Sequence, residues 1–395
     1  MMKQNFMEKL LDGVEVEWRK LGEVANLITT GKLNANEMEE EGLFPFYTCN
    51  ENPYRINSYA FDLEAIIISG NGSQVGHLNY FKGKFNAYQR TYIVANFIEC
   101  IQIMYIYHYL NHTLKSYIIK NSRKGSVPYI TMPMLENFEI PIPCPQNPEK
   151  SLKIQAEIVR ILDTFIELIA ELAAELTARK KQYNYYRDKL LSFEDEEVEW
   201  RVLGEVTLPT SNIRWRDTND TYRYIDLTSV CRDKNIIIET TEISAENAPS
   251  RAQKLVAKDD VIFATTRPTQ QRLCLITEEY SGEVASTGYC ILRAKEEVLP
   301  KWIYYFITST RFKEYVEDNQ SGSAYPAISD AKVKEFNIPV PSLNEQESIV
   351  SILDKFEVLT TSIVDGLPRE IELRQKQYEH YRKMLLSFPR EGVAE

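Results

Sequence analysis

The chain carries the same series of sequence blocks twice, and this internal repeat limits its fold more than any other feature. EVEWRKLGEV at 15–24 returns as EVEWRVLGEV at 197–206, with nine of ten residues identical. Two further blocks recur in the same order: IVRILDTFIEL at 158–168 with IVSILDKFEVL at 349–359, and KQYNYYRDKLLSF at 181–193 with KQYEHYRKMLLSF at 376–388. Between the blocks the halves agree only in outline. The repeat predicts two equivalent halves, each with a shared framework and its own insert.

A partial third copy opens the chain. MEKLLDGVEVEW at 7–18 parallels RDKLLSFEDEEVEW at 187–200. This copy holds the last turn of a helix without the body of that helix. We therefore expect the C-terminal helix to fold back and supply the body, so that the repeat is quasi-circular and the two ends of the chain lie close together.

The second and third blocks belong to long helices. Apolar residues recur three and four positions apart from 149 to 191, which predicts an amphipathic helix at coiled-coil spacing, beginning after Pro148. The second copy is expected to begin after IPVPSLNEQE at 338–347, to break near Gly366 and to restart with Pro368 in its first turn. Because neither helix can bury its apolar stripe alone, we expect the two to pack antiparallel. Two separate surface helices are the alternative.

The inserts have the pattern of mixed α/β domains. Strand-like runs are EAIIISG, RTYIVANF, DVIFATT and GYCILRA, and one helix is expected in each insert, near 98–118 and 299–317. The predicted fold class is α+β: two mixed α/β domains joined by two long helices packed as an antiparallel coiled coil, with a pseudo-twofold internal repeat. The expected boundaries are 1–13 for an N-terminal remnant of the helical repeat, 14–148 and 197–341 for the domains, and 149–196 and 342–395 for the helices.

Composition narrows the setting and raises one difficulty. The chain of 395 residues has the length of two domains, and no apolar run is long enough for a membrane span or a signal sequence, so a cytoplasmic protein is expected. The six cysteines stand far apart without a CxxC pair, which signals neither a zinc cluster nor a disulfide framework. The net charge of -11 is unfavourable for binding nucleic acid, so such binding would depend on local patches or on partners.

Three motifs resemble catalytic or cofactor motifs, and each departs from its pattern. SGNGSQVG at 69–76 has its glycines as GxGxxxG and precedes a strand-like HLNYF, so it is a polar hairpin or a loop that presents side chains to DNA, rather than a dinucleotide loop. ENPYR at 51–55 lacks one proline of an amino-methyltransferase motif. His108 and His112 have the spacing of a zinc helix, but Tyr109 stands where a metalloprotease needs glutamate. We expect packed or surface histidines, no catalytic residue, no metal and no cofactor.

The remaining candidates are polar clusters that suit DNA. Arginine reads guanine and glutamine reads adenine in the major groove, while hydroxyl and amide groups hold phosphates. Clusters that mix arginine with glutamine, asparagine and threonine favour base readout, although each alone is also typical of a solvated loop. The candidate DNA-binding residues are Asn71, Ser73, Gln74, Gln89, Arg90, Arg123, Lys124, Arg214, Arg216, Thr266, Arg267, Gln270, Gln271, Arg272, Ser323 and Tyr325.

The order of these blocks resembles the specificity subunits of type I restriction-modification systems over essentially the whole chain. The resemblance lies in VEWRKLGEV, VEWRVLGEV, KQYNYYRDKLLSF and GLPREIELRQKQYEHYRKMLLSF. It implies that the inserts are target recognition domains, each reading one half of a bipartite double-stranded DNA sequence. It also implies two modification subunits that carry the adenine methyltransferase site, and restriction subunits in the full complex.

The resemblance further implies that the helices set the distance between the two half-sites. An uninterrupted helix from 158 to 191 would be roughly 50 Å long at 1.5 Å per residue, against about 34 Å for one turn of DNA. The readers could then sit on successive turns of one face of the duplex. A coiled-coil scaffold that binds only protein and a free-standing DNA methyltransferase are the alternatives.

Overall fold

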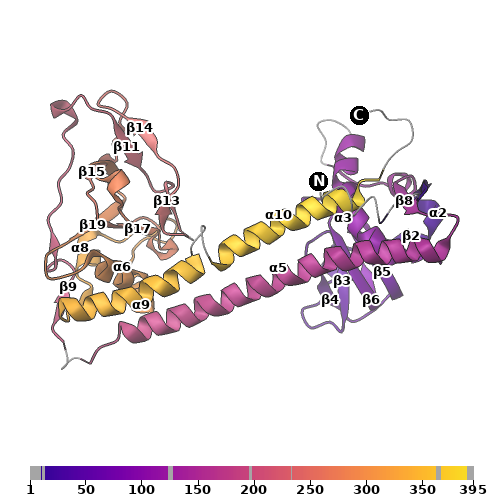
Figure 1. Cartoon of the computed structure of the whole chain (residues 1–395), viewed down its shortest axis with the longest axis horizontal. Helices are drawn as coiled ribbons and strands as arrows, with labels where there is room; N and C mark the ends of the chain where they lie inside the picture. Colours follow the sequence, from indigo (N-terminus) through magenta and orange to yellow (C-terminus); the bar gives the residue numbers. More distant parts are fainter. Residues whose placement is uncertain are drawn as a thin grey trace. The chain divides into compact units, whose positions relative to one another are not determined.

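The chain divides into two compact units in this computed structural model (Figure 1). Unit 1 comprises Met1–Ala170 and Leu373–Glu395, and unit 2 comprises Glu171–Glu372. The structure describes residues 10, 14–122, 128–194, 198–232, 234–361 and 366–388.

Unit 1 is built on a six-stranded sheet with the order β2-β7-β5-β6-β3-β4. Its strands are β2 (Ala25–Thr30), β7 (Thr91–Phe97), β5 (Phe61–Ser69), β6 (Leu78–Ala87), β3 (Phe44–Tyr47) and β4 (Tyr54–Ile56), and β1 (Val16–Lys20) pairs with β8 (Glu139–Pro143) beside it. The short helices are α2 (Leu21–Val24), η1 (Ala35–Glu37) and α4 (Met132–Glu136), and the long one is α3 (Ile103–Asn121). The sheet explains the run of isoleucines in β5. Ile66 and Ile68 pack toward α3, whereas Ala65 and Ile67 pack with Phe85 on the other face.

Unit 2 has the same central strands and a second sheet. The central sheet has the order β10-β19-β16-β17, with β10 (Thr207–Leu208), β19 (Tyr289–Ala294), β16 (Val261–Ala264) and β17 (Leu273–Leu275). The second sheet is β14 (Thr241–Ile243), β11 (Tyr222–Ile225), β18 (Val284–Ser286) and β15 (Ala252–Leu255), and two pairs are β9 (Trp200–Val202) with β20 (Asn337–Pro339) and β12 (Val230–Cys231) with β13 (Ile236–Ile237). The helices are α6 (Pro300–Thr308), α7 (Thr310–Asn319), α8 (Asp330–Lys334), η2 (Trp215–Asp217), η3 (Pro268–Gln270) and η4 (Glu278–Tyr280).

The two central sheets correspond strand by strand. The order β2-β7-β5-β6 in unit 1 matches β10-β19-β16-β17 in unit 2. In both sheets the strand that comes first in the chain lies beside the one that comes last, and the second and third strands follow. The repeated blocks around the sheets therefore enclose the same core topology, as the internal repeat predicts. The strand-like runs of the sequence are confirmed as β5, β7, β16 and β19.

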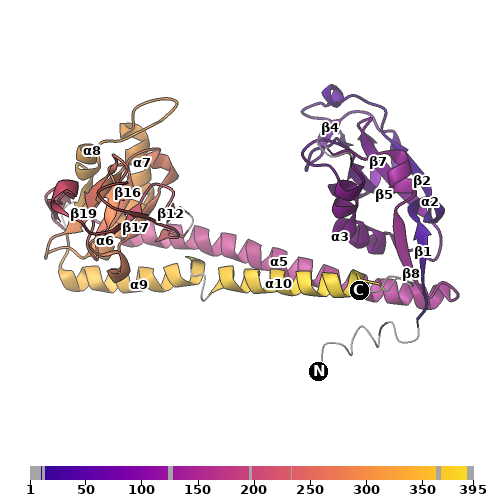
Figure 2. The same cartoon turned by 90° about the horizontal axis from the view of Figure 1, so that it is seen from above.

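The long helices that carry the repeated blocks, which we call the framework helices, are α5, α9 and α10, and the predicted antiparallel packing is confirmed. α5 spans Pro148–Leu190, 43 residues, and is about 65 Å long at 1.5 Å per residue. In unit 1, Phe165 of α5 stacks on Tyr381 of α10 (Leu367–Leu386), with ring centroids 5.2 Å apart. In unit 2, Phe356 of α9 (Leu343–Thr361) stacks on Tyr186 of α5 at 6.1 Å. These pairs occupy the same positions in the repeat, and Figures 1 and 2 show α10 and α9 lying along α5.

Several helix boundaries test the sequence prediction. The break before Pro368 is confirmed, since α10 begins at Leu367 directly after Gly366, whose φ of 90° suits glycine. The predicted start of the second helix was wrong: α9 begins at Leu343, because the main-chain carbonyl of Ser342 already accepts the amide of Gln346 at 3.0 Å. The single helix expected near 299–317 is two helices, because the Ser309 side chain caps α7 by accepting the amide of Phe312.

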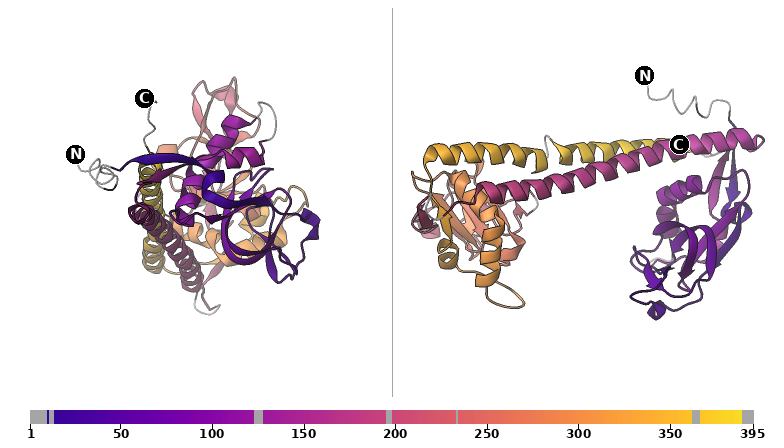
Figure 3. Two further views of the ribbon diagram at one scale, coloured as in Figure 1. Left: turned by 90° about the vertical axis from the view of Figure 1, so that its right-hand side faces the viewer. Right: turned by 90° about the horizontal axis from the view of Figure 1, so that it is seen from below.

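The end of each framework helix packs on the core of the neighbouring domain. The end of α10, yellow in Figure 3, lies in unit 1. Leu385, Leu386 and Phe388 join the core of this unit, where Phe388 meets Tyr105 edge to face with ring centroids 6.4 Å apart. The same block at 190–193 joins the core of unit 2, where Phe193 meets Trp302 at 6.1 Å. The prediction that the C-terminal helix folds back is thereby confirmed. Of the N-terminal copy, Leu10 packs on the unit 1 core, and residues 1–9 and 11–13 lie outside the described residues.

A buried glutamine fastens each domain to its helix in the same way. Gln155 is fully buried, accepts the amide of Gln102 at 2.9 Å and donates to the carbonyl of Cys100 at 2.8 Å. Gln346 is its repeat equivalent: it accepts the amide of Leu299 at 2.9 Å and donates to the carbonyls of Glu297 and Pro341. A buried amide that satisfies three main-chain groups is expensive to replace with an apolar side chain.

Replacing Gln346 by leucine is expected to destabilise unit 2 by about 2–4 kcal/mol, because one amide and two carbonyls would be left buried without partners. Amide hydrogen exchange of the whole chain should show the loss of protection confined to unit 2. Gln182→Leu, the same change at an exposed position of α5 in this unit, is the matched control and should have little effect. Equal protection in the two variants would contradict the prediction.

The histidine of the zinc-like spacing has a packing role, as expected. His108 is buried, and its Nε2 hydrogen-bonds Oδ1 of Asp163 on α5 at 2.8 Å. Burial lowers the pKa of His108, and the hydrogen bond to Asp163 opposes this shift. At the equivalent place in unit 2, the hydroxyl of Tyr305 donates to Asp354 on α9 at 2.5 Å. Both contacts hold a domain helix against a framework helix.

Candidate nucleic-acid interface

Three loop segments meet at one end of each central sheet, and their hydrogen bonds are the same in both units. In unit 1 the amide of Gly70 donates to the carbonyl of Arg90 at 3.0 Å, and the amide of Ile130 donates to Gly70 at 2.8 Å. In unit 2 Thr265 donates to Gly288 at 2.8 Å, and Ile328 donates to Thr265 at 2.9 Å. We call these ends the recognition edges: residues 70–77, 88–90 and 128–130 in unit 1, and 265–272, 286–288 and 321–328 in unit 2.

The recognition edge of unit 1 gathers five of the predicted DNA-binding residues. Ser73 and Gln74 are exposed and Asn71 is half-buried in the turn between β5 and β6, while Gln89 and Arg90 are exposed between β6 and β7. The segment 69–76 is the polar hairpin expected from its sequence. Its glycines serve the backbone: Gly72 and Gly76 have φ of 81° and 80°, and a Cβ at Gly70 would come within 2.3 Å of the Arg90 carbonyl oxygen.

The tertiary structure adds residues that the sequence did not single out. The amide of Gln89 donates to the carbonyl of Leu33 at 2.9 Å, and the Cys49 thiol donates to the carbonyl of Arg90 at 3.4 Å. The exposed side chains of Lys32, Asn34 and Asn50 accordingly belong to the loops at this edge. They are scattered through separate loops, so no local cluster marked them. Arg123 and Lys124, also candidates, lie outside the described residues.

In unit 2 the recognition edge joins two predicted clusters that are far apart in the sequence. Thr266 forms an isolated bridge with Ala327, and the amide of Arg267 donates to the carbonyl of Pro326 at 2.7 Å. The guanidinium of Arg267 lies over the Tyr325 ring, 5.2 Å from its centroid, and 71% of Tyr325 is exposed. Ser323 is also exposed in this loop. Four candidates thus form one surface.

The structure separates the remaining candidates by their contacts. Arg272 is half-buried and donates to the carbonyls of Leu227 and Val230 at 2.9 and 3.1 Å, so its guanidinium holds the unit together. Its Nε donates to Oε1 of Gln270 at 3.4 Å. Gln271 is half-buried, and its Nε2 atom is shielded from solvent and has no hydrogen-bond partner among the described residues.

Arg214 and Arg216 lie around η2, over the second sheet of unit 2. Both side chains are exposed and face Asp217, at 4.0 and 3.7 Å respectively. Between them, Trp215 donates its indole N–H to the carbonyl of Ala252 at 2.9 Å. The neighbouring residue, Arg251, accepts the amide of Thr287, which lies in the recognition edge. This pair therefore lies beside the edge, and its positive charge is partly offset by a carboxylate.

Charge pairing distinguishes the arginines of the two edges from others in the chain. In unit 2, Arg223 is held by Glu283 and Glu279 at 2.9 Å each, and Arg293 by Asp260 at 2.7 Å, and these hydrogen bonds raise the pKa of both arginines. Within the described residues, no carboxylate lies within 4 Å of the guanidinium of Arg90 or Arg267. Local positive charge is thus available at both edges, although the chain as a whole is acidic.

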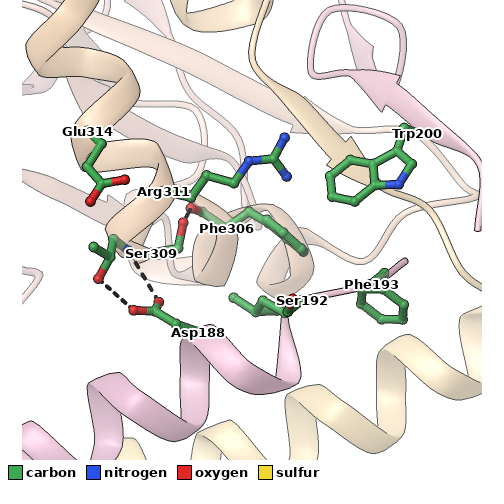
Figure 4. A pocket seen from close by; sticks show the side chains of 10 residues that line it. Asp188, Ser192, Phe193, Trp200, Phe306, Ser309, Arg311 and Glu314 are labelled. Atoms are coloured by element: carbon green, nitrogen blue, oxygen red, sulfur yellow. Dashed lines mark hydrogen bonds between the residues drawn. The ribbon is translucent and has the colours of Figure 1, made fainter. Parts of the chain in front are cut away.

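A large cavity, of about 510 Å³, lies in unit 2 where α5 ends (Figure 4). Repeated-block residues such as Phe193 and Trp200 line it together with residues of α6 and α7, and the guanidinium of Arg311 lies 4.5 Å from the centre of the Trp200 ring. Asp188 accepts the amide and the hydroxyl of Thr310, at 3.2 and 2.6 Å, at the first residue of α7. These contacts attach the framework helix to the domain.

No helix in the described part of the chain is both long and apolar enough to cross a membrane.

Comparisons with known proteins agree with this architecture. The model of the type I restriction modification DNA specificity domain matches residues 13–178 and again 207–373. The chain is 35% identical to the type I restriction enzyme EcoR124I/EcoR124II specificity subunit of Escherichia coli over 422 residues, covering 99% of this chain and 98% of the relative. It is 32% identical to the EcoprrI specificity subunit of Escherichia coli, covering 92% and 93%.

A solved structure shows the same fold. The crystal structure of the type I restriction-modification system S subunit from M. genitalium matches with a TM-score of 0.57 at 16% identity, covering 96% of this chain and 98% of that one. The double family match favours neither a protein-only scaffold nor a free-standing methyltransferase. The chain belongs to the family of type I restriction-modification specificity subunits, non-catalytic proteins that recognise DNA with two recognition domains.

Proposed function

We propose that the chain reads a bipartite DNA target with its two recognition edges, one half-site for each unit. The observation that carries this proposal is the equivalence of the edges: the same three segments, with the same hydrogen bonds, present different side chains in the two units. Unit 1 presents mainly amides and hydroxyls, such as Asn71 and Gln74. Unit 2 presents Arg267 on Tyr325. A common scaffold with different side chains is what two different half-sites require.

The partners follow from the same division. The chain assembles with other subunits of a restriction-modification complex, and we propose that two modification subunits dock on it and supply the adenine methyltransferase site. A restriction subunit joins them in the full enzyme. This chain would hold sequence and register on double-stranded DNA, while a modification subunit flips the target adenine into its own pocket. We propose that it works in the cytoplasm, where the DNA is. We also propose that the recognition domains span residues 14–148 and 197–341.

Alanine substitutions at one edge should affect one half-site only. In the assembled methyltransferase, Thr266→Ala, Arg267→Ala and Gln270→Ala together are expected to lower the preference for one half-site by about 100-fold or more, since each base contact is worth a factor of roughly 10 or more. Asn71→Ala, Ser73→Ala and Gln74→Ala should do the same for the other half-site. Gln271 is left in place because its buried amide is part of the packing. Competition binding with duplexes altered in either half measures both effects.

Lys258→Ala is the matched control, because this exposed lysine precedes β16 at the opposite end of the strand from the recognition edge. It should leave both half-site preferences unchanged. If either triple variant lost affinity equally for both half-sites, the edges would not be separate readers. Thermal unfolding of each variant distinguishes such a loss from simple destabilisation.

A further inference from the structure

Arg267 is held in a defined orientation at the recognition edge of unit 2. Its amide is bonded to Pro326, its neighbour Thr266 bridges to Ala327, and its guanidinium lies over the exposed ring of Tyr325. The loop that carries the ring is itself closed by reciprocal main-chain hydrogen bonds between Ser321 and Ala327, at 2.8 and 2.9 Å. An arginine on a flexible loop would lack such a support. Here the main-chain hydrogen bonds hold the loop and the ring supports the guanidinium at 5.2 Å from its centroid.

The backbone around Arg267 has an uncommon conformation. Arg267 and Gln271 both have positive φ, 49° and 47°, and the one-turn helix η3 lies between them. Side-chain-bearing residues rarely adopt this left-handed conformation, and residues held there cluster at binding sites. Two such residues in one eight-residue loop give the chain a sharp path, and Arg267 emerges at the first of them.

The chemistry of an oriented, unpaired arginine favours a base over a phosphate. Guanidinium presents its donors in a planar fork, which matches O6 and N7 of guanine in the major groove, and each such pair discriminates strongly against other bases. A phosphate can also accept both donors of the fork, but the point charge of a flexible lysine binds it too, so a phosphate contact does not require an arginine that is held in place. Within the described residues Arg267 has no carboxylate partner, so its fork is free to bind, whereas Arg214 and Arg216 face Asp217.

We infer that Arg267 reads a guanine in the half-site bound by unit 2, with Tyr325 as the residue that positions its guanidinium. This inference rests on the proposed function of the recognition edges. The equivalent loop of unit 1, residues 70–77, contains Asn71 and Gln74 and no arginine. The dependence on guanine through this loop is therefore specific to one half-site.

The test uses the assembled methyltransferase and DNA lacking single acceptor atoms. The target of the wild-type enzyme is first mapped by sequencing methylated DNA. Each guanine of the unit 2 half-site is then replaced in turn by 7-deazaguanine, which pairs normally but lacks N7. At one position the replacement should weaken wild-type binding about 10-fold or more. The same replacement should have no further effect on Arg267→Ala, because the partner of N7 is already gone.

Three further variants separate base reading from charge and from folding. Arg267→Lys keeps the charge but replaces the fork with a flexible ammonium, so its binding should depend on N7 less than that of the wild-type enzyme and more than that of Arg267→Ala. Tyr325→Ala should bind the natural target about 3- to 10-fold more weakly than the wild-type enzyme, with the loss confined to the same base position, because the cation–π support of the guanidinium is gone. Tyr325→Phe keeps the ring, so it should bind as tightly as the wild-type enzyme. This variant shows whether the weaker binding of Tyr325→Ala comes from loss of the ring.

Two outcomes would overturn the inference. One is a unit 2 half-site without guanine. The other is an Arg267→Ala enzyme that binds all sequences more weakly to the same degree, with the slope of log affinity against log salt reduced by about one, which identifies a phosphate contact. A wild-type enzyme without any sequence preference would instead refute the proposed function of the edges, and the two failures are thereby distinguishable.

Discussion

With four residues inserted into α5 between Ala170 and Glu171, the assembled methyltransferase is expected to methylate a new target, with both half-sites unchanged and a longer gap between them. α5 contributes residues to both units, and the insertion point is the boundary between them. Four residues add about 6 Å and a rotation of about 40° beyond one full turn of helix. One base pair adds about 3.4 Å and roughly 35°. The gap should therefore grow by about one or two base pairs.

The measurement is sequencing of methylated DNA from cells that hold the variant and its modification subunits. Methylation of the original target should fall by about 100-fold or more, because one half-site is out of register and each lost base pair of recognition costs about 1–3 kcal/mol. Substitutions of equal length at the same place, Glu171→Gln with Ala174→Gln, are the control and should preserve the original gap.

A complementary variant concerns the second helical segment. This segment has four more residues than the first between the shared blocks, and deletion of residues 362–365, which lie outside the described residues, removes the difference. A shortened gap would show that both helical segments set the spacing. An unchanged gap in this variant alone assigns the spacing to α5. An unchanged gap in both variants would mean that contacts of the recognition domains, and not helix length, fix it.

The framework could be predicted from the sequence because its information is local and repeated. Apolar spacing in α5 and the Gly366 and Pro368 pair in the second segment fix helices and breaks through short-range sterics. The starts of α7 and α9 could not be found in this way. They depend on the bonds that Ser309 and Ser342 make to main-chain amides, and a serine fits a turn as well as the start of a helix.

The recognition edges could be predicted only in part. Polar composition identified loops such as 265–272, but residue type does not show what a side chain touches in the fold. Arg272 and Arg267 are five positions apart, yet one is held by main-chain carbonyls and the other is exposed on Tyr325. The pairing of Arg267 with Tyr325 depends on the sheet, which brings distant loops to one edge. Base readout is therefore a property of tertiary structure that a single sequence does not reveal.

Replacing residues 197–341 by a second copy of residues 15–150, which keeps Ser342 in the place of Ser151, is expected to give a specificity subunit that recognises the unit 1 half-site twice, as an inverted repeat. The reason is that the contacts between domain and framework helix recur. Gln346 would meet the main chain around Gln102 as Gln155 does now, and His108 would face Asp354, the equivalent of Asp163. Methylation should appear at the symmetric target and disappear from the natural one, which sequencing of methylated DNA detects directly.

The reverse chimera, with residues 197–341 in place of 15–150, should be less stable than the first chimera. Tyr304 is buried and donates to Glu357 of α9 at 2.6 Å, but the equivalent position of α5 is Ile166. The chimera would leave this hydroxyl without its carboxylate, at a cost of about 1–3 kcal/mol. Ile166→Glu should restore the stability, measured by thermal unfolding. If the two chimeras were equally stable without Ile166→Glu, the hydrogen bond between Tyr304 and Glu357 would not matter for the packing of the domain on its helix.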